Sequence, residues 1–295
     1  MFMRITFLSM FLVGMMFPST LFSGVFIDDL RCMPVLIQIP SPNNTHVECG
    51  TGIYLDDSNN LFLVTAAHCI FDIFSTNKLQ LIGSNAVLSS IPRGTNHSDR
   101  SIIHLNLEVL RDNGLIKRHS DHDIAIIKLA HTDAVTNGLI RNRSPSIGVS
   151  QMTPTILPVP WSIYDSCKAF NDVPAGTDSY IMGYPVSLLS GHSGEIDFSA
   201  PLIRKGVISQ KNQNTKKLII DSAVFGGNSG GPVLIVENPN LTETDFHIVG
   251  IVTQYVPDIT PVNLSLGVTN SALANSGYGV AEPIDYALEL MRQFH

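Results

Sequence analysis

Short runs of β-branched and aromatic residues recur along most of the chain. Runs such as "PVLIQI", "LFLVTAA", "DIAIIKL" and "FHIVGIVTQYV" are separated by glycine, proline, asparagine or aspartate. Runs of this length between turn residues are typical of strands in a β-sandwich or β-barrel. Only residues 283–295 place apolar residues at the spacing of an amphipathic helix. We therefore expect an all-β protein that ends in one helix.

The segment 141–175 separates two groups of such runs. It is rich in serine and proline and shows weak periodicity, which is typical of an extended connection. We therefore expect a first β-unit at 28–140, a second at 176–282 and the helix at 283–295. Within the first unit, the polar stretch 55–62 predicts a hairpin turn.

The first 27 residues form a separate segment. They carry one early charge, Arg4, and no other charge. The apolar run at 5–17 has the length of the central region of a signal peptide, so residues 1–24 predict export to a secreted or periplasmic location. The alternative is a membrane anchor formed by residues 5–27, because the uncharged stretch is long enough to span a bilayer. A membrane is a partner only in that second case.

Charge and composition exclude some classes of function. The formal net charge is −7, and the 18 lysines and arginines are scattered along the chain. Phosphate binding needs a clustered basic face, so we expect no nucleic-acid partner. No cysteine or histidine spacing is typical of a zinc site, and the sequence shows no cofactor requirement.

The chain has four cysteines, Cys32, Cys49, Cys69 and Cys167. An even number behind an export signal indicates disulfide bonds formed in an oxidising compartment. The spacing alone leaves all three pairings open. The alternative is a set of unrelated buried thiols.

One serine, Ser229, lies among four glycines in "GGNSGGP". Glycine is costly to order, so a turn of this composition needs a reason. One reason is a backbone bent so that the Ser229 hydroxyl can attack a substrate. A serine hydroxyl is a weak nucleophile, and it needs a general base, a group that orients the base and donors for the oxyanion.

A histidine and an aspartate elsewhere in the chain fit these roles. His68 follows the apolar run "FLVTAA", so a rigid strand can hold it as a general base. Asp123 heads the run "IAIIKL", where its carboxylate can accept the Nδ1 proton of a histidine, and Asp121 is the alternative. The N–H groups of Gly227 and Ser229 can point into one oxyanion hole. Taken singly, such a histidine or aspartate is more often structural than catalytic.

Together, "TAAHC", "DIAIIKL" and "GNSGGP" resemble the trypsin-like, chymotrypsin-fold serine endopeptidases, over about residues 34–290. The resemblance implies two antiparallel six-stranded β-barrels with the active site in the crevice between them. It also implies that Ser229 attacks a peptide carbonyl, that His68 is its base and that Asp123 orients His68.

The resemblance also bears on the cysteines and on activation. "CGTG" and "AAHC" look like the segments that carry the family's disulfide beside the catalytic histidine, which implies a bond between Cys49 and Cys69 and leaves Cys32 and Cys167 as a second pair. The residue before the nucleophile is Asn228, where pancreatic-type members have an aspartate that pairs with a freed N-terminal amine. We therefore expect no activation of that kind.

The segment "DSAVFGGNSGG" looks closer to the bacterial, HtrA-like branch of the family, although no part of the chain resembles a PDZ module. In the family, the primary specificity pocket is lined by the segment before the serine, here Ala223, Val224 and Phe225. A facing strand, here Thr253, Gln254 and Tyr255, forms the opposite wall, and Gly279 lies at the back. None of these residues is charged. The resemblance therefore implies a preference for a small or medium-sized apolar side chain before the cleaved bond. Thr253 can also hydrogen-bond Asp123, on the side of the carboxylate that faces away from the substrate.

These features indicate an exported serine endopeptidase that hydrolyses polypeptide substrates through an acyl-enzyme. The first alternative is a catalytically silent relative that acts as a binding module. The second is an esterase-like hydrolase, but its G-x-S-x-G motif precedes a helix, whereas "PVLIV" after Ser229 predicts a strand. The sequence leaves the oligomeric state open.

Overall fold

The computed structural model describes residues 30–41, 46–92, 99–132, 143–153, 160–186, 196–197, 199–237, 245–263 and 269–295. The N-terminal segment, expected to be a signal peptide or an anchor, lies outside these residues. Within the described ranges, no helix is both long and apolar enough to cross a membrane.

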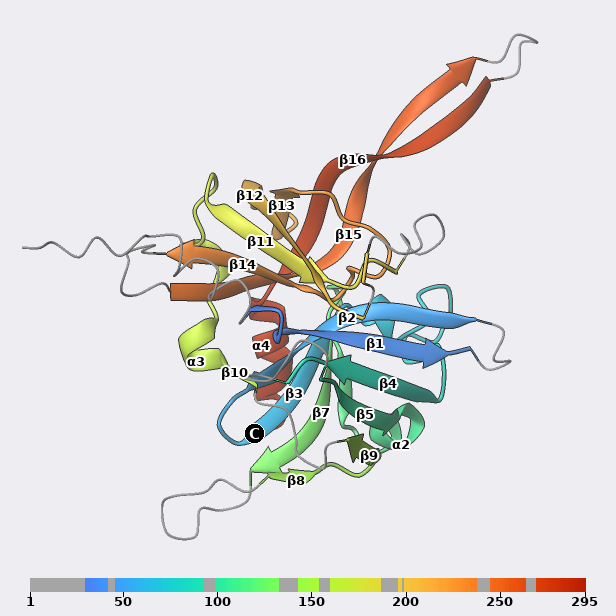
Figure 1. Ribbon diagram of the computed structural model, residues 1–295, viewed down its shortest axis with the longest axis vertical. Coiled ribbons are helices and arrows are strands. Elements are labelled where there is room, and N and C mark those ends of the chain that lie inside the picture. Colours follow the sequence, from blue (N-terminus) through green and yellow to red (C-terminus); the bar gives the residue numbers. More distant parts are fainter. Residues whose placement is uncertain are drawn as a thin grey trace, which may run out of the picture.

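The described chain forms two β-units followed by a helix (Figure 1). The strands of the first unit are β1 (Pro34–Pro40), β2 (Val47–Asp56), β3 (Asn60–Thr65), β4 (Asn85–Ser90), β5 (Ser101–Asn106), β6 (Ile116–Arg118), β7 (Ala125–Thr132), β8 (Arg143–Pro145), β9 (Val149–Thr153) and β10 (Trp161–Ser162). Those of the second are β11 (Asp178–Gly183), β12 (Leu202–Asn212), β13 (Lys217–Asp221), β14 (Pro232–Glu237), β15 (Asp245–Asn263) and β16 (Thr269–Pro283). The helices are η1 (Ala67–Cys69), α2 (Leu107–Asp112), α3 (Ile163–Ser166), η2 (Phe170–Asp172) and α4 (Asp285–Arg292).

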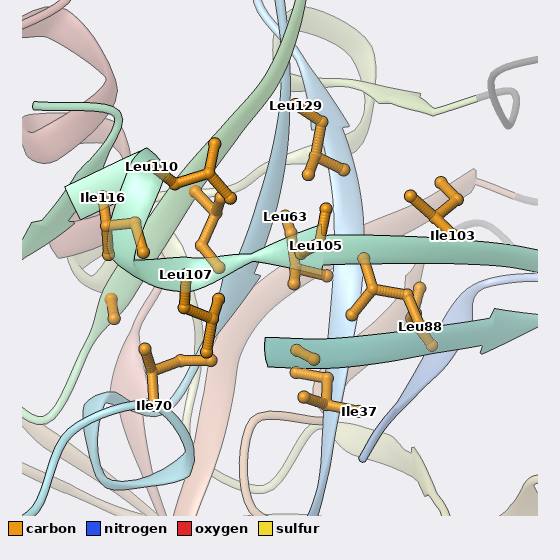
Figure 2. Close-up of a cluster of buried hydrophobic side chains, with 14 of the residues drawn as sticks. Ile37, Leu63, Ile70, Leu88, Ile103, Leu105, Leu107, Leu110, Ile116 and Leu129 are labelled. Carbon is orange, nitrogen blue, oxygen red and sulfur yellow. The ribbon is translucent and has the colours of Figure 1, made fainter. Parts of the chain in front are cut away.

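The first unit is a curled ten-stranded sheet. Its strands follow the order β6-β7-β3-β2-β1-β4-β5-β9, with β8 beside β7 and β10 beside β2. The stretch expected to turn at 55–62 joins β2 to β3, and the Asp57 carboxylate fixes the turn by accepting the N–H groups of Asn59 and Asn60. Because side chains alternate along a strand, one face of the sheet forms the apolar core shown in Figure 2, which includes Ile37, Leu63, Leu88, Ile103, Leu105 and Leu129.

The second unit is a closed six-stranded antiparallel barrel. The order is β11-β12-β13-β16-β15-β14, and β14 pairs back onto β11. Its interior is filled by a separate apolar cluster that includes Ile181, Ile208, Leu218, Ile220, Val233, Val249 and Val252. Closure gives every strand of the barrel two neighbours, so its strands present few unpaired backbone groups.

The expected all-β architecture of two units and a final helix is therefore confirmed, with one difference in detail. The second unit closes as a six-stranded barrel, but in the described residues the first sheet remains open between β6 and β9. Part of the segment expected to be a connection, 141–175, adds to this sheet instead, because β8 pairs with β7 and β9 pairs with β5.

Helix α4 fixes the two units against each other. Its buried residues share one apolar cluster with side chains from both units, namely Phe62, Val64 and Ile126 of the first and Met182, Leu234 and Ile251 of the second. Burial of each such aliphatic side chain contributes about 1.5–3 kcal/mol. This shared cluster therefore fixes the position of one unit relative to the other.

Strands β15 and β16 continue beyond the barrel as a projecting two-stranded ribbon (Figure 1). The ribbon is paired from Pro257 and Asn275 to Asn263 and Thr269. Pro257 and Pro261 lie on β15, and proline has no N–H to offer to a further strand.

Candidate active site

His68 and Asp123 meet because the strands that carry them are paired. Thr65 at the end of β3 lies opposite Ala125 at the start of β7, so the residues just beyond these ends come together. The Asp123 carboxylate lies 2.6 Å from His68 Nδ1 and accepts the His68 backbone N–H at 3.0 Å. With Nδ1 held by the carboxylate, Nε2 is the ring nitrogen left to act as a base.

These contacts shift the pKa of both side chains. Burial lowers the pKa of His68, but the hydrogen bond with Asp123 and the neighbouring Cys69 thiol raise it more, to about 10. Burial raises the pKa of Asp123, but its hydrogen bonds and charge interaction with His68 hold that pKa below its usual value. Asp123 is therefore ionised at neutral pH and stabilises a proton on His68.

The turn around Ser229 depends on glycine. Gly227 has φ +95°, and a Cβ there would lie 2.2 Å from the Tyr184 carbonyl oxygen. Gly230 has φ +86°, and its Cβ would lie 1.9 Å from the Thr51 carbonyl oxygen. Both positions combine a left-handed backbone with a contact that no side chain can fit. The glycines of "GGNSGGP" are therefore required by a specific bend.

Two N–H groups of this turn have no hydrogen-bond partner among the residues that the structure describes. Asn228 N–H donates to the Phe225 carbonyl and Gly231 N–H to the Asn228 carbonyl, both at 2.9 Å. In the described part of the chain, the N–H groups of Gly227 and Ser229 donate no hydrogen bond. An anion beside Ser229 can therefore be offered two backbone donors.

Thr51 of β2 ties this turn to the first sheet. Its N–H donates to the Ser229 carbonyl at 2.8 Å, and its hydroxyl donates to the Gly227 carbonyl at 2.6 Å. Its own carbonyl accepts the Thr65 hydroxyl at 2.6 Å, and Thr65 precedes η1, which carries His68. Buried hydrogen bonds thus connect the Ser229 turn to the strand end that carries His68.

The Ser229 hydroxyl is directed to the second barrel in this structure. It donates to the Thr253 carbonyl at 3.4 Å, and among the described residues it makes no hydrogen bond with His68. The Thr253 hydroxyl donates to the Val280 carbonyl at 3.4 Å rather than to Asp123 as expected. Thr253 lies in the β-bulge between Val252 and Gln254, which turns its side chain toward β16.

Arg204 of β12 lies directly behind the turn. Its Nη1 and Nη2 donate to Asn228 Oδ1 at 3.2 and 3.1 Å, and Nη1 also donates to the Ala223 carbonyl. Phe225 N–H donates to the same Oδ1 at 3.1 Å, and the guanidinium lies 4.9 Å from the centre of the Phe225 ring. Burial lowers the pKa of Arg204, but a guanidinium remains charged at any working pH. An internal cation therefore holds both ends of the segment before Ser229.

Of the expected specificity residues, Val224 and Tyr255 lie next to Gly279. A Cβ on Gly279 would lie 2.5 Å from Val224 Cγ2, and Val224 is 2% exposed. Tyr255 pairs with Gly279 across the two strands, and its side chain and that of Gln254 are exposed. The Val224 methyl groups fill the space in front of Gly279.

A buried carboxylate lies behind Asp123. Glu282 of β16 is 1% exposed, and its carboxylate lies 3.0 Å from His122 Nδ1 and 3.0 Å from Lys217 Nζ. Asp123 N–H donates to it at 3.5 Å. The His122 ring stacks on Tyr286 of α4 with ring centres 3.4 Å apart. This cluster joins the loop that carries Asp123 to the second barrel.

No implied disulfide is formed, because all four cysteines are free thiols. Cys49 and Gly50 are consecutive on β2, so their side chains leave opposite faces of the sheet. Cys69 Sγ lies 2.6 Å from where a Cβ on Gly50 would be, and it donates to the Ser229 carbonyl at 3.4 Å. The Cys69 thiol is therefore on the face of β2 opposite to Cys49.

The second implied pair is also separate. Cys32 Sγ donates to the Pro92 carbonyl beyond β4, at 3.7 Å. The backbone of Cys167 forms an isolated parallel β-bridge with Ile248 of β15, in the second unit. Burial, followed by the charge of Asp285, raises the pKa of Cys167 to about 12. Its thiol therefore remains protonated at neutral pH.

The chain matches a protein family model over more than half of its length. The model for the trypsin-like peptidase domain matches residues 50–238, which include His68, Asp123 and Ser229. The chain belongs to the trypsin-like peptidase family. Among the described residues, no cluster of three or more histidine, cysteine or acidic side chains could bind a metal.

Solved structures give weaker similarities, and curated protein sequences give none. An HtrA-type protease, AlgW with a tripeptide, is 15% identical with a TM-score of 0.45, over 90% of this chain and 61% of the other. A serine endoprotease from Yersinia pestis is 18% identical with a TM-score of 0.46, over 91% of this chain and 65% of the other. The chain spans less than two thirds of the length of both proteins.

Sequence reasoning missed three residues of the site. Thr51, Arg204 and Glu282 each act through contacts between segments far apart in the chain. A signal was present for two of them, because Arg204 and Glu282 are charged residues inside strand-like runs, "LIRKGVIS" and "GYGVAEP". A charge in a strand that must face a core is rarely left without a partner. Nothing in the sequence distinguishes Thr51 from other threonines.

Proposed function

We propose that this trypsin-like peptidase is an exported endopeptidase that cleaves polypeptides through an acyl-enzyme on Ser229. The observation that carries the proposal is the pair of hydrogen bonds that Asp123 accepts from His68, next to a glycine turn whose Gly227 and Ser229 N–H groups have no partner among the described residues. A base, its orienting group, a hydroxyl and two oxyanion donors are the parts that acyl transfer needs.

The acylation step follows from these parts. His68 Nε2 takes the Ser229 proton while Oγ bonds to the scissile carbonyl carbon, and the carbonyl oxygen becomes an oxyanion. The N–H groups of Gly227 and Ser229 hydrogen-bond to that oxyanion. The carbon–nitrogen bond then breaks, and His68 gives its proton to the leaving amine.

Deacylation repeats these steps with water in place of the amine. His68 takes a proton from the water, whose oxygen bonds to the acyl carbon. The Ser229–carbon bond then breaks, and His68 returns the proton to Ser229. Acylation requires the Ser229 hydroxyl to leave the Thr253 carbonyl and turn toward His68 by a rotation of its side chain. Catalytic hydrogen bonds are often looser before substrate binds.

The proposed pocket accepts a small or medium-sized apolar side chain before the cut bond. Val224 lies against Gly279 and shortens the space there. The nearby guanidinium of Arg204 is already engaged by the Asn228 side chain and the Ala223 carbonyl. Alanine and valine should therefore be preferred over arginine or glutamate at this position.

The proposed enzyme needs no freed N-terminal amine. Arg204 supplies a half-buried cation beside Asn228, the residue before the nucleophile, and Asn228 carries no charge that an amine could neutralise. Export, to a secreted, periplasmic or membrane-anchored location, rests on the sequence of residues 1–27. The mass of the mature N-terminus distinguishes cleavage near residue 24 from retention of an anchor.

Labelling with a fluorophosphonate probe tests the proposal. The probe should attach to Ser229 of the wild type and not to Ser229→Ala, and a tryptic map should find the adduct on Ser229. A matched control is Ser222→Ala, which removes another hydroxyl from the same segment. If the folded wild type takes no label, the protein is a catalytically silent binding module.

A further inference from the structure

A cavity of about 430 Å³ opens beside His68, and all of its described lining residues belong to the first unit. One wall is Glu48 in β2, and the rest is the loop that follows η1, from Phe71 to Ile82. No described residue of the second barrel takes part, although the second barrel carries Ser229 and the proposed specificity pocket. The cavity therefore extends from His68 into the first unit.

The cavity has an apolar floor and an apolar rim. Phe71 and Leu81 form the floor, where they are 1% and 7% exposed and pair with each other across the loop. At the rim, Ile73 is 54% exposed and Phe74 is 91% exposed. An exposed phenylalanine next to a catalytic histidine is the kind of patch that marks a binding surface.

The loop that carries this rim is fixed by hydrogen bonds. Asp72 N–H donates to the Gln80 carbonyl at 2.8 Å, and Ile82 N–H donates to the Ile70 carbonyl at 3.0 Å. The Asp72 carboxylate accepts the Phe74 N–H at 2.9 Å. The loop is thus held at both its base and its tip, and Phe74 is presented to solvent by a preformed turn.

The cavity also has an acidic edge. Glu48 and Asp72 both line it, and no lysine or arginine is among its described lining residues. The Glu48 carboxylate is half-exposed, with His46 at 3.3 Å. Lys78 of the same loop directs its ammonium to the Ser120 carbonyl. An acidic substrate residue in the cavity would be repelled by the carboxylates of Glu48 and Asp72, whereas a basic substrate residue would be attracted by them.

The position of the cavity identifies the part of the substrate that can reach it. His68 protonates the leaving amine, so the residue that carries that amine must lie against His68. The part before the cut bond lies along the second barrel in the proposed function. The part after the cut bond is therefore the one that passes over the first unit.

We propose that this cavity selects polypeptides with a large apolar side chain, such as leucine or phenylalanine, at the first or second residue after the cut bond, and that Glu48 and Asp72 disfavour acidic residues there. The inference rests on the proposed endopeptidase activity. It names a second specificity element, which lies on the first unit, whereas the pocket around Gly279 lies on the second.

Internally quenched peptides test this selectivity. One series is identical before the bond and carries leucine, phenylalanine, serine or aspartate at the first two positions after it. We expect kcat/KM to be at least about tenfold higher for leucine or phenylalanine than for aspartate. Phe74→Ser and Ile73→Ser should each reduce the ratio of leucine to serine, and Glu48→Gln should reduce the ratio of serine to aspartate. Ile147→Ser removes another exposed apolar side chain, far along the chain, and should change neither ratio.

Three results would overturn the inference. They are wild-type ratios near one, a Phe74→Ser variant with unchanged ratios, or a Phe74→Ser variant whose altered preference concerns residues before the bond. A peptidyl nitroanilide with valine before the bond has no amino acid after it, so wild-type turnover of this compound reports the proposed function separately. If that compound and all the peptides are left intact, the proposed function fails and this inference fails with it.

Discussion

The Arg204 guanidinium faces the Asn228 side-chain oxygen at 3.1 and 3.2 Å, immediately behind the turn that carries Ser229. Arg204 also holds the Ala223 carbonyl at the other end of the same segment. One half-buried cation thus fixes both the segment that lines the proposed specificity pocket and the turn that carries the Gly227 and Ser229 N–H groups.

Replacement of Arg204 should impair catalysis more than folding. Arg204→Met removes all the donors to Asn228 Oδ1 except the Phe225 N–H, so we expect kcat/KM to fall about 100-fold, as when one oxyanion donor is lost. Arg204→Lys should recover little, because an ammonium cannot reproduce the planar fork. The neighbouring variant Lys205→Met breaks only an exposed ion pair with Asp178 and should stay within twofold. Nitroanilide hydrolysis and thermal unfolding measure both effects, and equal losses in Arg204→Met and Lys205→Met would contradict this role.

The pH profile should show the influence of Asp123 on His68. Only neutral His68 can act as a base, and its pKa is raised to about 10, so kcat/KM should increase with pH well above the usual histidine value of about 6.5. Asp123→Asn removes the main cause of the raised pKa, so the acid limb should move to lower pH while kcat falls about 10⁴-fold. Profiles of kcat/KM between pH 5 and 10.5 measure this shift. An acid limb below pH 6 in the wild type would show that Asp123 does not control His68.

The buried Glu282 should contribute to both stability and catalysis. Glu282→Gln leaves Lys217 without its buried counter-charge and weakens the bond to Asp123 N–H. We expect about 2 kcal/mol of lost stability, since one partner of a buried pair is left uncompensated, and a fall in kcat of about tenfold with little change in KM. The double variant Glu282→Gln with Lys217→Met should recover part of the stability.

Glu289→Gln is the matched control for Glu282. Glu289 also pairs with a histidine, His119, but its side chain is 51% exposed. Exposed pairs contribute about 0–1 kcal/mol, so this variant should be close to wild type. Chemical denaturation and steady-state kinetics compare the two substitutions. Equal effects of Glu282→Gln and Glu289→Gln would refute a special role for the buried carboxylate.

Gly230 should tolerate no side chain. In Gly230→Ala, the Cβ must approach the Thr51 carbonyl and the Thr65 hydroxyl, at 1.9 and 2.1 Å in the present backbone. We expect a loss of at least about 3 kcal/mol, from left-handed strain plus overpacking. In the control Gly114→Ala, φ is also positive at +69° but nothing lies within 4 Å, so only strain of about 1 kcal/mol remains. A Gly230→Ala variant as stable as Gly114→Ala would mean that the turn can shift.

The extent to which sequence alone predicted the fold depends on whether a feature is local. Alternating apolar runs and the turn at 55–62 depend on neighbours in the chain, so the β-units and the final helix could be predicted. The open edge of the first sheet could not, because the pairing of β8 with β7 and of β9 with β5 depends on the path of the chain in space. The disulfides implied by family resemblance failed for a similar reason, because Cys69 contacts the face of β2 on the side of Gly50.

The candidate site divides in the same way. His68, Asp123 and Ser229 could be named because each sits in a short motif with a chemical requirement of its own. Arg204, Glu282 and Thr51 were missed because their partners lie from 14 to 178 residues away in the chain. Buried charges need partners, but a sequence does not say which ones.

Trapping of the acyl-enzyme tests the central claim most directly. The wild type is mixed with a peptidyl nitrophenyl ester that has valine before the bond, quenched in acid within milliseconds and analysed by intact mass and peptide mapping. The account predicts a burst of nitrophenol equal to the enzyme concentration and an acyl group on Ser229, with neither in Ser229→Ala. Ester turnover by the wild type without any adduct on Ser229, or an equal burst in Ser229→Ala, would contradict it.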